Sequence, residues 1–521
     1  MKKNKTSSFI LELPLRTCPK EEKELLSRFE SARHLYNATL GEAKKRVMLV
    51  RQSKLFQKAR NLPKNNKQRK ELFQLAKNKY NFSEYSLHQY VGKLRHNIVN
   101  NIDIHTAQKL ATRAFRASEK ILYGTAKKVR FKGYNQLNSV ESKSNVAGIR
   151  WKNNQIQWNG LCLNPIIQIK NEVVCYGLQH KTKYCRILRK VIRGKNYFYV
   201  QLILEGKPLI KDKNKLGEGV VAFDFGPSTI AIVSQNKDNK FDARLLQFCS
   251  ELKSKEKQIR HYQQKIDRQR RVSNPNNYLS NGKIKKGRLQ WKKSKRQLEN
   301  QKQLKDVYRI TSSHRKSLQG KLINETLRMG NIFKTEKVSR KWLQSLYGKS
   351  VGMRAPGMYV SGMKRKAESA GGLFLEFPPQ TTKLSQSCIC ERQHKKSLSE
   401  RVHICECGVC VQRDLFSAYL ALFVEKQGEK YVLQADQAKR YWSSADTLLQ
   451  TAWRTAVQST SGGTCPSSFG KPISQSQSGS FAKEGIAKFD VRNVVLAVKS
   501  KESPKENEVV SFKTYGIINP L

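Results

Sequence analysis

Residues 219–226 read Gly-Val-Val-Ala-Phe-Asp-Phe-Gly, so that an apolar run leads into an acid, Asp224, with a glycine close behind it. A short apolar run bounded by turn residues is typical of a buried strand. Gly226-Pro227-Ser228 predicts a turn, and a second strand is expected to continue to Ser234. Asp224 is therefore expected near the end of a strand, where its carboxylate can meet acids from distant parts of the chain.

Two further acids follow apolar or helical patterns. Glu336 ends the stretch Asn331-Ile-Phe-Lys-Thr335, and Asp414 lies at the start of the helical pattern Arg413-Asp-Leu-Phe-Ser-Ala-Tyr-Leu420. Carboxylates on separate elements can converge to bind Mg²⁺ or Mn²⁺, because hard cations prefer oxygen ligands. Each acid could also be an ordinary structural residue: a strand end or turn, or a first-turn acid favoured by a helix dipole. Glu325 and Glu376 are alternatives to Glu336.

The joint order of these elements is more informative than any single acid. This order is the one expected of a ribonuclease H-like fold of the RuvC type: a strand with Asp, a hairpin, helices, a strand with Glu, another strand, an insert and a helix with Asp. In two-metal hydrolysis one ion lowers the pKa of the attacking water and the other stabilises the leaving 3′ oxygen. The sequence therefore predicts that Asp224, Glu336 and Asp414 are catalytic and bind Mg²⁺.

Five of the 11 cysteines are clustered shortly before Asp414. Two close pairs separated by a polar loop are the usual layout of a four-ligand zinc site. The predicted Zn²⁺ ligands are Cys388, Cys390, Cys405 and Cys407. Four protein ligands leave no position for water, so this zinc would be structural.

The ligand set of the cysteine cluster is open to alternatives. Cys410, His394 and His403 are possible substitutes, and pairing Cys407 with Cys410 would restore the commoner Cys-x-x-Cys spacing. A set of reduced surface cysteines without metal is the alternative to a zinc site. The remaining cysteines are scattered, which favours a reducing cytosol over a disulfide scaffold.

The chain of 521 residues carries 100 Lys and Arg against 40 Asp and Glu, a formal net charge of +60. Such a charge attracts polyanions, and nucleic acid is the natural partner. A membrane partner is not expected, because no apolar run reaches the roughly 18 residues of a spanning helix. There is no signal-peptide core either, so a prokaryotic cytosolic, nucleoid-associated location is expected.

Residues 251–300 predict a long basic helical pair, broken near Asn274-Pro275-Asn276-Asn277. A solvated helical face is the usual meaning of a charge run. With this net charge, contact with the phosphate backbone is the better interpretation. The residues predicted to contact nucleic acid are Arg268, Arg270, Arg271, Lys285, Lys286, Arg288, Lys292, Lys293, Lys295 and Arg296.

The predicted fold class is α/β and α+β multidomain: a ribonuclease H-like (RuvC) nuclease domain with a zinc-ribbon-like insert, preceded by a small β-barrel with a helical insertion. Residues 7–16 predict a strand, residues 21–60 a helix, Cys185 to Glu205 a hairpin and Val307 to Arg328 a further helix. The predicted domains are a wedge-like barrel (1–20 and 126–210), a helical recognition lobe (21–125), the nuclease domain (215–384 and 411–452), the zinc-binding insert (385–410) and a mostly disordered tail (453–521).

Several of these motifs resemble those of the transposon-encoded TnpB proteins. Val221-Ala-Phe-Asp-Phe-Gly226 resembles their first RuvC motif, and Thr335-Glu-Lys-Val338 their second. The segment from Thr382 to Asp414 resembles their zinc insert and third motif, although its cysteine pairs are one residue tighter than the common form and Cys410 is extra. Ala32-Arg-His-Leu-Tyr-Asn37 is similar to their helical start, and the resemblance spans roughly residues 7–430.

This resemblance implies a programmable nuclease related to the type V CRISPR effectors. Its partners would be a guide RNA made from the transposon end and a DNA target, with a short flanking motif read by the barrel and helical lobe. Asp224, Glu336 and Asp414 would then bind Mg²⁺ for cleavage. The alternatives are a DNA-binding transposition-associated protein such as a strand-transferring transposase, a guide-directed binder without cleavage, and a CRISPR effector.

Overall fold

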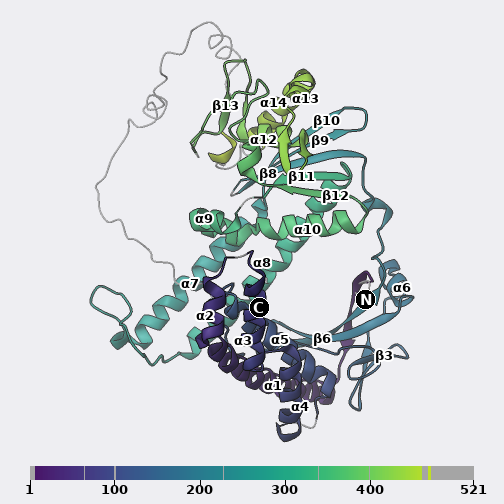
Figure 1. The fold of residues 1–521 in the computed structure, drawn as a ribbon, viewed down its shortest axis with the longest axis vertical. Helices are drawn as coiled ribbons and strands as arrows, with labels where there is room; N and C mark the ends of the chain where they lie inside the picture. Colours follow the sequence, from purple (N-terminus) through teal and green to yellow (C-terminus); the bar gives the residue numbers. More distant parts are fainter. Residues whose placement is uncertain are drawn as a thin grey trace. The chain divides into compact units, whose positions relative to one another are not determined.

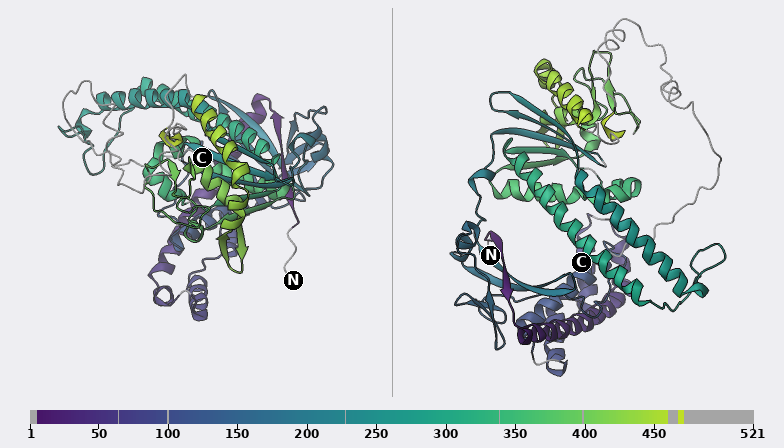
Figure 2. Two further views of the ribbon diagram at one scale, coloured as in Figure 1. Left: turned by 90° about the horizontal axis from the view of Figure 1, so that it is seen from above. Right: turned by 180° about the vertical axis from the view of Figure 1, so that it is seen from behind.

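The computed structural model describes residues 6–459, apart from residues 64, 99–100, 227, 338 and 398, together with residues 467–470. The chain forms two compact units. The first unit comprises Met1–Ala222, Ser234–Lys240 and Gln247–Phe377, and the second comprises Phe223–Val233, Phe241–Leu246 and Pro378–Leu521, each considered over its described residues. Figure 1 labels the elements, and Figure 2 gives two further views.

The first unit contains a seven-stranded sheet in the order β2-β6-β7-β1-β5-β4-β3. All neighbouring pairs in this sheet are antiparallel. Its strands are β1 (Ser8–Arg16), β2 (Ser139–Glu141), β3 (Arg150–Lys152), β4 (Gln155–Trp158), β5 (Leu161–Pro165), β6 (Thr182–Ile192) and β7 (Lys195–Glu205). The strand expected over residues 7–16 is confirmed, whereas closure of the sheet into a barrel stays a prediction.

The hairpin expected from Cys185 to Glu205 is also confirmed, as β6 and β7. Arg193 and Gly194 form its turn, with φ angles of 49° and 81°. Two consecutive residues with positive φ match the right-handed twist of the flanking strands, and glycine adopts this conformation without steric cost. Along β7 the buried side chains Phe198, Val200 and Leu202 alternate with more exposed ones, which explains why the period of two was visible in the sequence.

Six helices accompany this sheet in the first unit. They are α1 (Pro19–Gln52), α2 (Lys54–Asn61), α3 (Lys67–Lys79), α4 (Glu84–Ile98), α5 (Ile104–Leu122) and α6 (Glu172–Leu178). Residues 21–60 are helical as expected, with one break at Ser53, whose hydroxyl accepts the N–H of Phe56 and so begins α2. The buried face of α1 carries Leu25, Phe29 and Leu35, which join one hydrophobic core with the inner face of the sheet.

A five-stranded sheet in the order β10-β9-β8-β11-β12 carries the first two predicted acids. Its strands are β8 (Gly219–Phe225), β9 (Thr229–Asn236), β10 (Phe241–Gln247), β11 (Ile332–Glu336) and β12 (Leu373–Phe377), so the strands predicted around Asp224 and Glu336 are confirmed. β11 and β12 are parallel, with Glu336 paired to Phe377. In the first unit β8 and β11 begin side by side, since the N–H of Asn331 donates to the carbonyl oxygen of Gly219 (3.0 Å).

The remaining helical elements of the first unit are η1 (Asp212–Asn214), η2 (Ser250–Leu252), α7 (Lys253–Ser273), η3 (Pro275–Asn277), α8 (Lys295–Leu327), α9 (Arg340–Arg354) and α10 (Pro356–Ser369). The two long helices α7 and α8 lie side by side (Figures 1 and 2).

The helical prediction for residues 278–294 is wrong, whereas the helix expected from Val307 is confirmed as the second part of a longer helix. Residues 278–294 form a loop, and α8 then continues unbroken from Lys295 to Leu327. Two glycines, Gly282 and Gly287, adopt positive φ in the loop and interrupt a helix. The hydroxyl of Ser294 accepts the N–H of Gln297 and begins α8 at its observed position.

The second unit contains α11 (Pro379–Thr382), β13 (Val402–Ile404), β14 (Cys410–Gln412), α12 (Arg413–Leu422), β15 (Val424–Gln427), β16 (Lys430–Leu433), α13 (Ala435–Arg440), α14 (Trp442–Gln458) and η4 (Ser467–Phe469). All residues of α12 from Asp414 to Leu422 are buried, which makes it the central helix of this unit. The helix predicted to begin beside Asp414 is therefore confirmed.

Part of the segment predicted to be a disordered tail is structured. α14 continues to Gln458, and its Trp453 indole N–H donates to the carbonyl oxygen of Phe469 (2.8 Å), both side chains being buried. Most of residues 453–521 lies outside the described residues. Across the part of the chain that the structure describes, no helix combines the length and apolar character needed to cross a membrane.

Candidate metal centres and nucleic-acid surface

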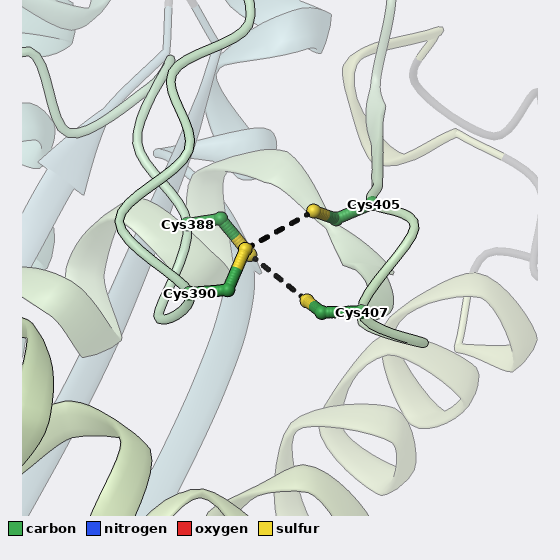
Figure 3. Close-up of side chains that lie close together, drawn as sticks. All are labelled: Cys388, Cys390, Cys405 and Cys407. Carbon is green, nitrogen blue, oxygen red and sulfur yellow. Dashed lines mark hydrogen bonds between the residues drawn. The ribbon is translucent and has the colours of Figure 1, made fainter.

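The four predicted zinc ligands come together in the second unit (Figure 3). Each pair lies in a tight turn. The N–H of Cys388 donates to the carbonyl oxygen of Arg392, and Glu391, which lies between these two residues, adopts a φ of 64°. The N–H of Cys405 bonds to the carbonyl oxygen of Val409, with Gly408 at a φ of 91°. These left-handed residues reverse the chain just after each second cysteine, which turns both sulfur atoms of a pair inward.

The geometry of the cluster fits a tetrahedral metal site. The Sγ atoms of Cys388 and Cys407 are 3.5 Å apart, as are those of Cys390 and Cys405. All four sulfur atoms lie within 4.8 Å of one another. Four sulfur atoms at about 2.3 Å from a zinc ion have separations in this range. The cluster can therefore hold a metal ion such as zinc.

The thiols of this cluster influence each other's ionisation. Burial raises the pKa of Cys388, and the neighbouring thiols raise it further. Burial also raises the pKa of Cys407. Burial acts in the same direction on Cys390, but the N–H of Arg392 and the adjacent thiols outweigh it, so the pKa of Cys390 falls to about 7. A metal ion would favour the thiolate form of all four, because thiolates and not thiols are its ligands.

The other candidate ligands do not belong to the cluster. Cys410 lies in β14, where it pairs with Ile404, and its carbonyl oxygen accepts from the Gln450 side chain. His394 is exposed. His403 lies in β13 with its ring fully buried against Phe416, at 4.4 Å between ring centroids. The ligand set left open by the sequence is thus narrowed to the two Cys-x-Cys pairs.

His403 has a packing role beside the cluster. Its Nδ1 contacts the Nζ of Lys396, whereas its buried Nε2 has no hydrogen-bond partner among the described residues. Burial lowers the pKa of His403, and the charge of Lys396 lowers it further, to about 3. Burial also lowers the pKa of Lys396, to about 8, against the opposing effect of Cys388 and Glu400. The ring is therefore neutral at pH 7.

Asp224 is the penultimate residue of β8 and is half-buried, and the turn after it is tightly packed. The N–H of Gly226 donates to the carbonyl oxygen of Thr229 (3.1 Å). A Cβ atom at Gly226 would collide with Thr229 Oγ1 and would lie 3.5 Å from Asp414 Oδ2. The turn that follows Asp224 therefore lies close to the carboxylate of Asp414 within the second unit, and the close contact that disfavours a side chain at position 226 is the one with Thr229.

Asp414 lies in the first turn of α12 and is 4% exposed. The Gln412 side chain caps this helix by accepting the N–H of Leu415 (2.7 Å). The positive end of the helix dipole favours a carboxylate at this position. Arg413 Nε lies 3.5 Å from Asp414 Oδ1, but the buried Oδ2 has no hydrogen-bond partner among the described residues. Such an oxygen is costly to bury unless a cation or water satisfies it.

Two hydroxyl groups near these acids were missed by the sequence reasoning. Thr229 Oγ1 and Ser417 Oγ are both buried and have no hydrogen-bond partner within the described residues. Ser417 lies three residues after Asp414, so both side chains are on one face of α12. Only the tertiary burial of these hydroxyls distinguishes them, because Ser and Thr at such positions carry no sequence signal.

Glu336 belongs to the first unit, where it is the half-buried last residue of β11. The two alternative acids, Glu376 and Glu325, lie on other elements. Glu376 lies on β12, with its carboxylate 3.6 Å from Lys364 Nζ, and Glu325 lies within α8. The N–H of Lys337 donates to the carbonyl oxygen of Phe377 (2.8 Å), so strand pairing continues one residue beyond Glu336. Glu336 keeps the strand-end position expected of it.

The basic residues predicted to contact nucleic acid cluster at one end of the α7–α8 pair. Arg268, Arg270 and Arg271 lie on α7, and Lys295 and Arg296 begin α8. The loop between the helices carries the others, namely Lys285, Lys286, Arg288, Lys292 and Lys293, all of which are exposed. A groove of about 500 Å³ next to this loop is lined by Lys265, Arg268, Gln269, Arg296, Glu299 and Asn300.

No family model and no curated protein matches the sequence. Among solved structures, the chain is similar to the cryo-EM structure of a Cas12f1–sgRNA–target DNA complex, with a TM-score of 0.39 and 10% identity over 79% of this chain and 98% of that chain. The cryo-EM structure of a CRISPR–Cas12f ternary complex gives a TM-score of 0.25 and 11% identity over 77% and 85%. Similarity this weak establishes neither a fold nor a function for this chain.

Proposed function

We propose that this chain is an RNA-guided, Mg²⁺-dependent DNA endonuclease encoded by a mobile element, with Asp224, Glu336 and Asp414 as the metal-binding acids. The observation that carries the proposal is the buried Oδ2 of Asp414, which has no hydrogen-bond partner among the described residues and approaches the turn that follows Asp224. A protein seldom buries such an oxygen without a use for it. A divalent cation is the partner that best suits a carboxylate in this position.

The residues present fit a hard divalent cation. Asp224 and Asp414 supply carboxylate oxygens, and the hydroxyls of Thr229 and Ser417 supply further buried oxygens in the same unit. The strand order supports adding Glu336 to this set, since β8 and β11 are neighbours in the sheet and begin side by side. A bound Mg²⁺ pair would activate water and stabilise the leaving oxygen of a phosphodiester.

The chain's own residues would position the reacting groups in this mechanism. Gln412 caps α12 by accepting the N–H of Leu415, which fixes the first turn of the helix on which Asp414 lies. Arg413, next to Asp414, has its other guanidinium nitrogen bonded to the carbonyl oxygen of Ser397 (3.2 Å) and so is held in place. These contacts would keep the carboxylates in one arrangement before the substrate binds.

The charge of the chain supports RNA and DNA as partners. A net charge of +60 exceeds what one short duplex contact requires, whereas a guide RNA and a target DNA together offer many more phosphates. In RNA-guided recognition, base pairing reads the sequence while the protein contacts the backbone and a short flanking motif. We further propose that the four-cysteine cluster binds zinc as a structural ion, since no ligand position remains for water.

The test is cleavage by the protein purified with its co-expressed RNA. Target DNA carrying the sequence of that RNA is supplied with Mg²⁺ or with EDTA, and wild type is compared with Asp224→Ala and with Asp238→Ala, which removes an exposed acid in the β9–β10 turn. We expect wild type and Asp238→Ala to cut and Asp224→Ala to bind without cutting. Equal cleavage by all three would refute the assignment of the acids, and binding without cleavage by wild type would identify a guide-directed binder.

A further inference from the structure

The loop between α7 and α8 (residues 274–294) has a defined shape although most of it is exposed. The buried Asn274 side chain holds its two ends together: it donates to the carbonyl oxygens of Arg270 and Lys292 (both 2.9 Å) and accepts the N–H of Lys292 (2.6 Å). Asn277 donates across the loop to the carbonyl oxygen of Gln290 (2.6 Å). The loop is therefore a fixed scaffold for the side chains that it carries.

Two aromatic rings of this loop are each covered on one face by an arginine. The guanidinium of Arg270 lies 5.1 Å from the ring centre of Trp291, and that of Arg271 lies 4.9 Å from the ring centre of Tyr278. The rings meet edge to face, 6.0 Å apart. Asp267 fixes both arginines, at 3.1 and 2.8 Å, and Arg270 also donates to the Tyr278 hydroxyl (3.0 Å).

This arrangement holds an aromatic ring in place at the protein surface. Trp291 remains 37% exposed, and the apolar side chains of Val272 and Leu279 nearby in the sequence are 81% and 45% exposed. A rigid ring loses little conformational entropy when a second planar group stacks on it. Cation–π attraction between Arg270 and the ring helps to hold the ring in this orientation. Trp291 is thus a partly exposed ring with one face covered by an arginine and its orientation fixed by its neighbours.

The charge around Trp291 selects for an anionic partner. Between Pro275 and Ser294 the chain has six lysines and arginines and no acid. The neighbouring groove adds three basic residues, Lys265, Arg268 and Arg296, against one acid, Glu299. Planar groups joined by phosphates are the partner that fits rings and positive charges placed side by side.

We propose that the α7–α8 loop binds unpaired nucleotides, with Trp291 stacking on a base and the surrounding basic residues contacting phosphates. The inference deepens the proposed function and rests on it for the identity of the nucleic acid, which is the RNA or a DNA strand separated from its complement. Unpaired bases expose their faces to an aromatic ring. A duplex hides them, and a ring can be inserted between its base pairs only if they are first unstacked.

The proposal separates two contributions to affinity that respond differently to salt. Phosphate contacts release counterions, so their loss lowers the slope of log affinity against log salt by roughly 0.7 to 0.9 for each phosphate. Stacking releases none, and its loss lowers affinity at every salt concentration alike. Substituting Trp291 should therefore shift the salt titration downward without changing its slope, whereas substituting Lys285 and Lys286 together should flatten it.

The experiment measures binding of full-length protein, freed of copurified nucleic acid, to three labelled probes of the same mixed sequence: single-stranded RNA, single-stranded DNA and duplex DNA. All measurements use the Asp224→Ala background in EDTA, so they do not depend on cleavage. We expect Trp291→Ala and Trp291→Leu to weaken binding of the single strands about 5- to 150-fold, with duplex binding changed by less than about twofold. Trp291→Phe, which keeps a ring, should lose less.

The two single-stranded probes identify the source of the nucleotides. A larger loss with the RNA probe assigns the site to the guide, a larger loss with the DNA probe assigns it to the separated DNA strand, and equal losses show that the site accepts both. Unchanged affinity in Trp291→Ala and Trp291→Leu, or an equal loss for the duplex, would overturn the proposal and leave the rings as packing groups of the loop. Failure of the cleavage test with this binding pattern intact would reject the proposed endonuclease alone.

Discussion

Replacing Asp414 with asparagine should make the metal-free protein more stable while abolishing its proposed activity. The carboxylate is 4% exposed, and its Oδ2 has no hydrogen-bond partner among the described residues. Burying an unsatisfied polar group costs about 1–3 kcal/mol, and more when the group is charged. Asn keeps the shape of Asp but removes the charge. Since the amide is still a buried polar group, the gain is the extra cost of the charge, and we expect Asp414→Asn to raise the free energy of unfolding in magnesium-free buffer by roughly 1 kcal/mol.

Mg²⁺ should reverse this order. A ligand at a hundred times its dissociation constant stabilises the folded state by about 2.7 kcal/mol. Wild type should gain this stability and Asp414→Asn should not, because the variant lacks one of the anionic ligands. The measurement is urea unfolding of both proteins, in chelator-free buffer without Mg²⁺ and in saturating Mg²⁺, followed by tryptophan fluorescence, so that the cysteine cluster is in the same state in both. The difference between the two conditions isolates the metal from the effect of the substitution on packing.

Asp436 provides a matched control, because it also lies in the first turn of a helix, α13, but is exposed. Asp436→Asn should be slightly less stable than wild type, since a favourable dipole interaction is lost, and should respond to Mg²⁺ as wild type does. A loss of stability in Asp414→Asn in magnesium-free buffer, or an equal gain from Mg²⁺ in both proteins, would refute the idea that this oxygen is held for a cation.

Other consequences of the structure can be measured on single substitutions. Cys405→Ser should lower the zinc content found by elemental analysis, because a ligand is lost, whereas Cys410→Ser should keep the wild-type content. Burial, aided by a neighbouring lysine, lowers the pKa of His403 to about 3. Below about pH 6.5 this histidine is therefore protonated in the unfolded chain but stays neutral in the folded protein. The stability from this residue is complete above that pH and falls as the pH falls, by about 2 kcal/mol at pH 5; urea unfolding at pH 7 and pH 5 should show a smaller loss in His403→Gln. Gly320→Ala, in the middle of α8 with open space around its Cβ, should raise the free energy of unfolding by about 0.5–1 kcal/mol. Gly177→Ala should lower it by about 1–3 kcal/mol in the same thermal or urea assay, because the new Cβ would lie 2.8 Å from a leucine side chain of β1.

The strands around the acids were predictable because their signal is local. The apolar run before Asp224 and the alternation along β6 and β7 follow from burial of one or both faces of an extended chain. The α7–α8 loop was not predictable from its charge and was expected to be helical. Its shape depends on Asn274, whose side chain bonds to Lys292 across the loop, and a single asparagine carries no such information in the sequence.

The candidate zinc ligands show the same division. The sequence supplied five cysteines and two histidines without a means of choosing among them. The choice depends on two turns, at Glu391 and Gly408, and on the β13–β14 hairpin, which holds Cys410 and His403 away from the four sulfur atoms. Turn conformation and strand pairing fix which atoms meet, and neither is encoded by spacing alone.

The amino-acid sequence by itself determines the net charge of this protein and the kinds of ligand atom that it carries. It also determines the strands and the helix on which the three acids lie. Those properties depend on residue chemistry and on neighbours along the chain. The tertiary structure decided which four sulfur atoms share a centre, that the Oδ2 of Asp414 is buried without a partner among the described residues, and that Trp291 is held at the surface beneath an arginine. These depend on packing between distant segments, because burial and hydrogen-bond satisfaction arise only when the chain has folded around them.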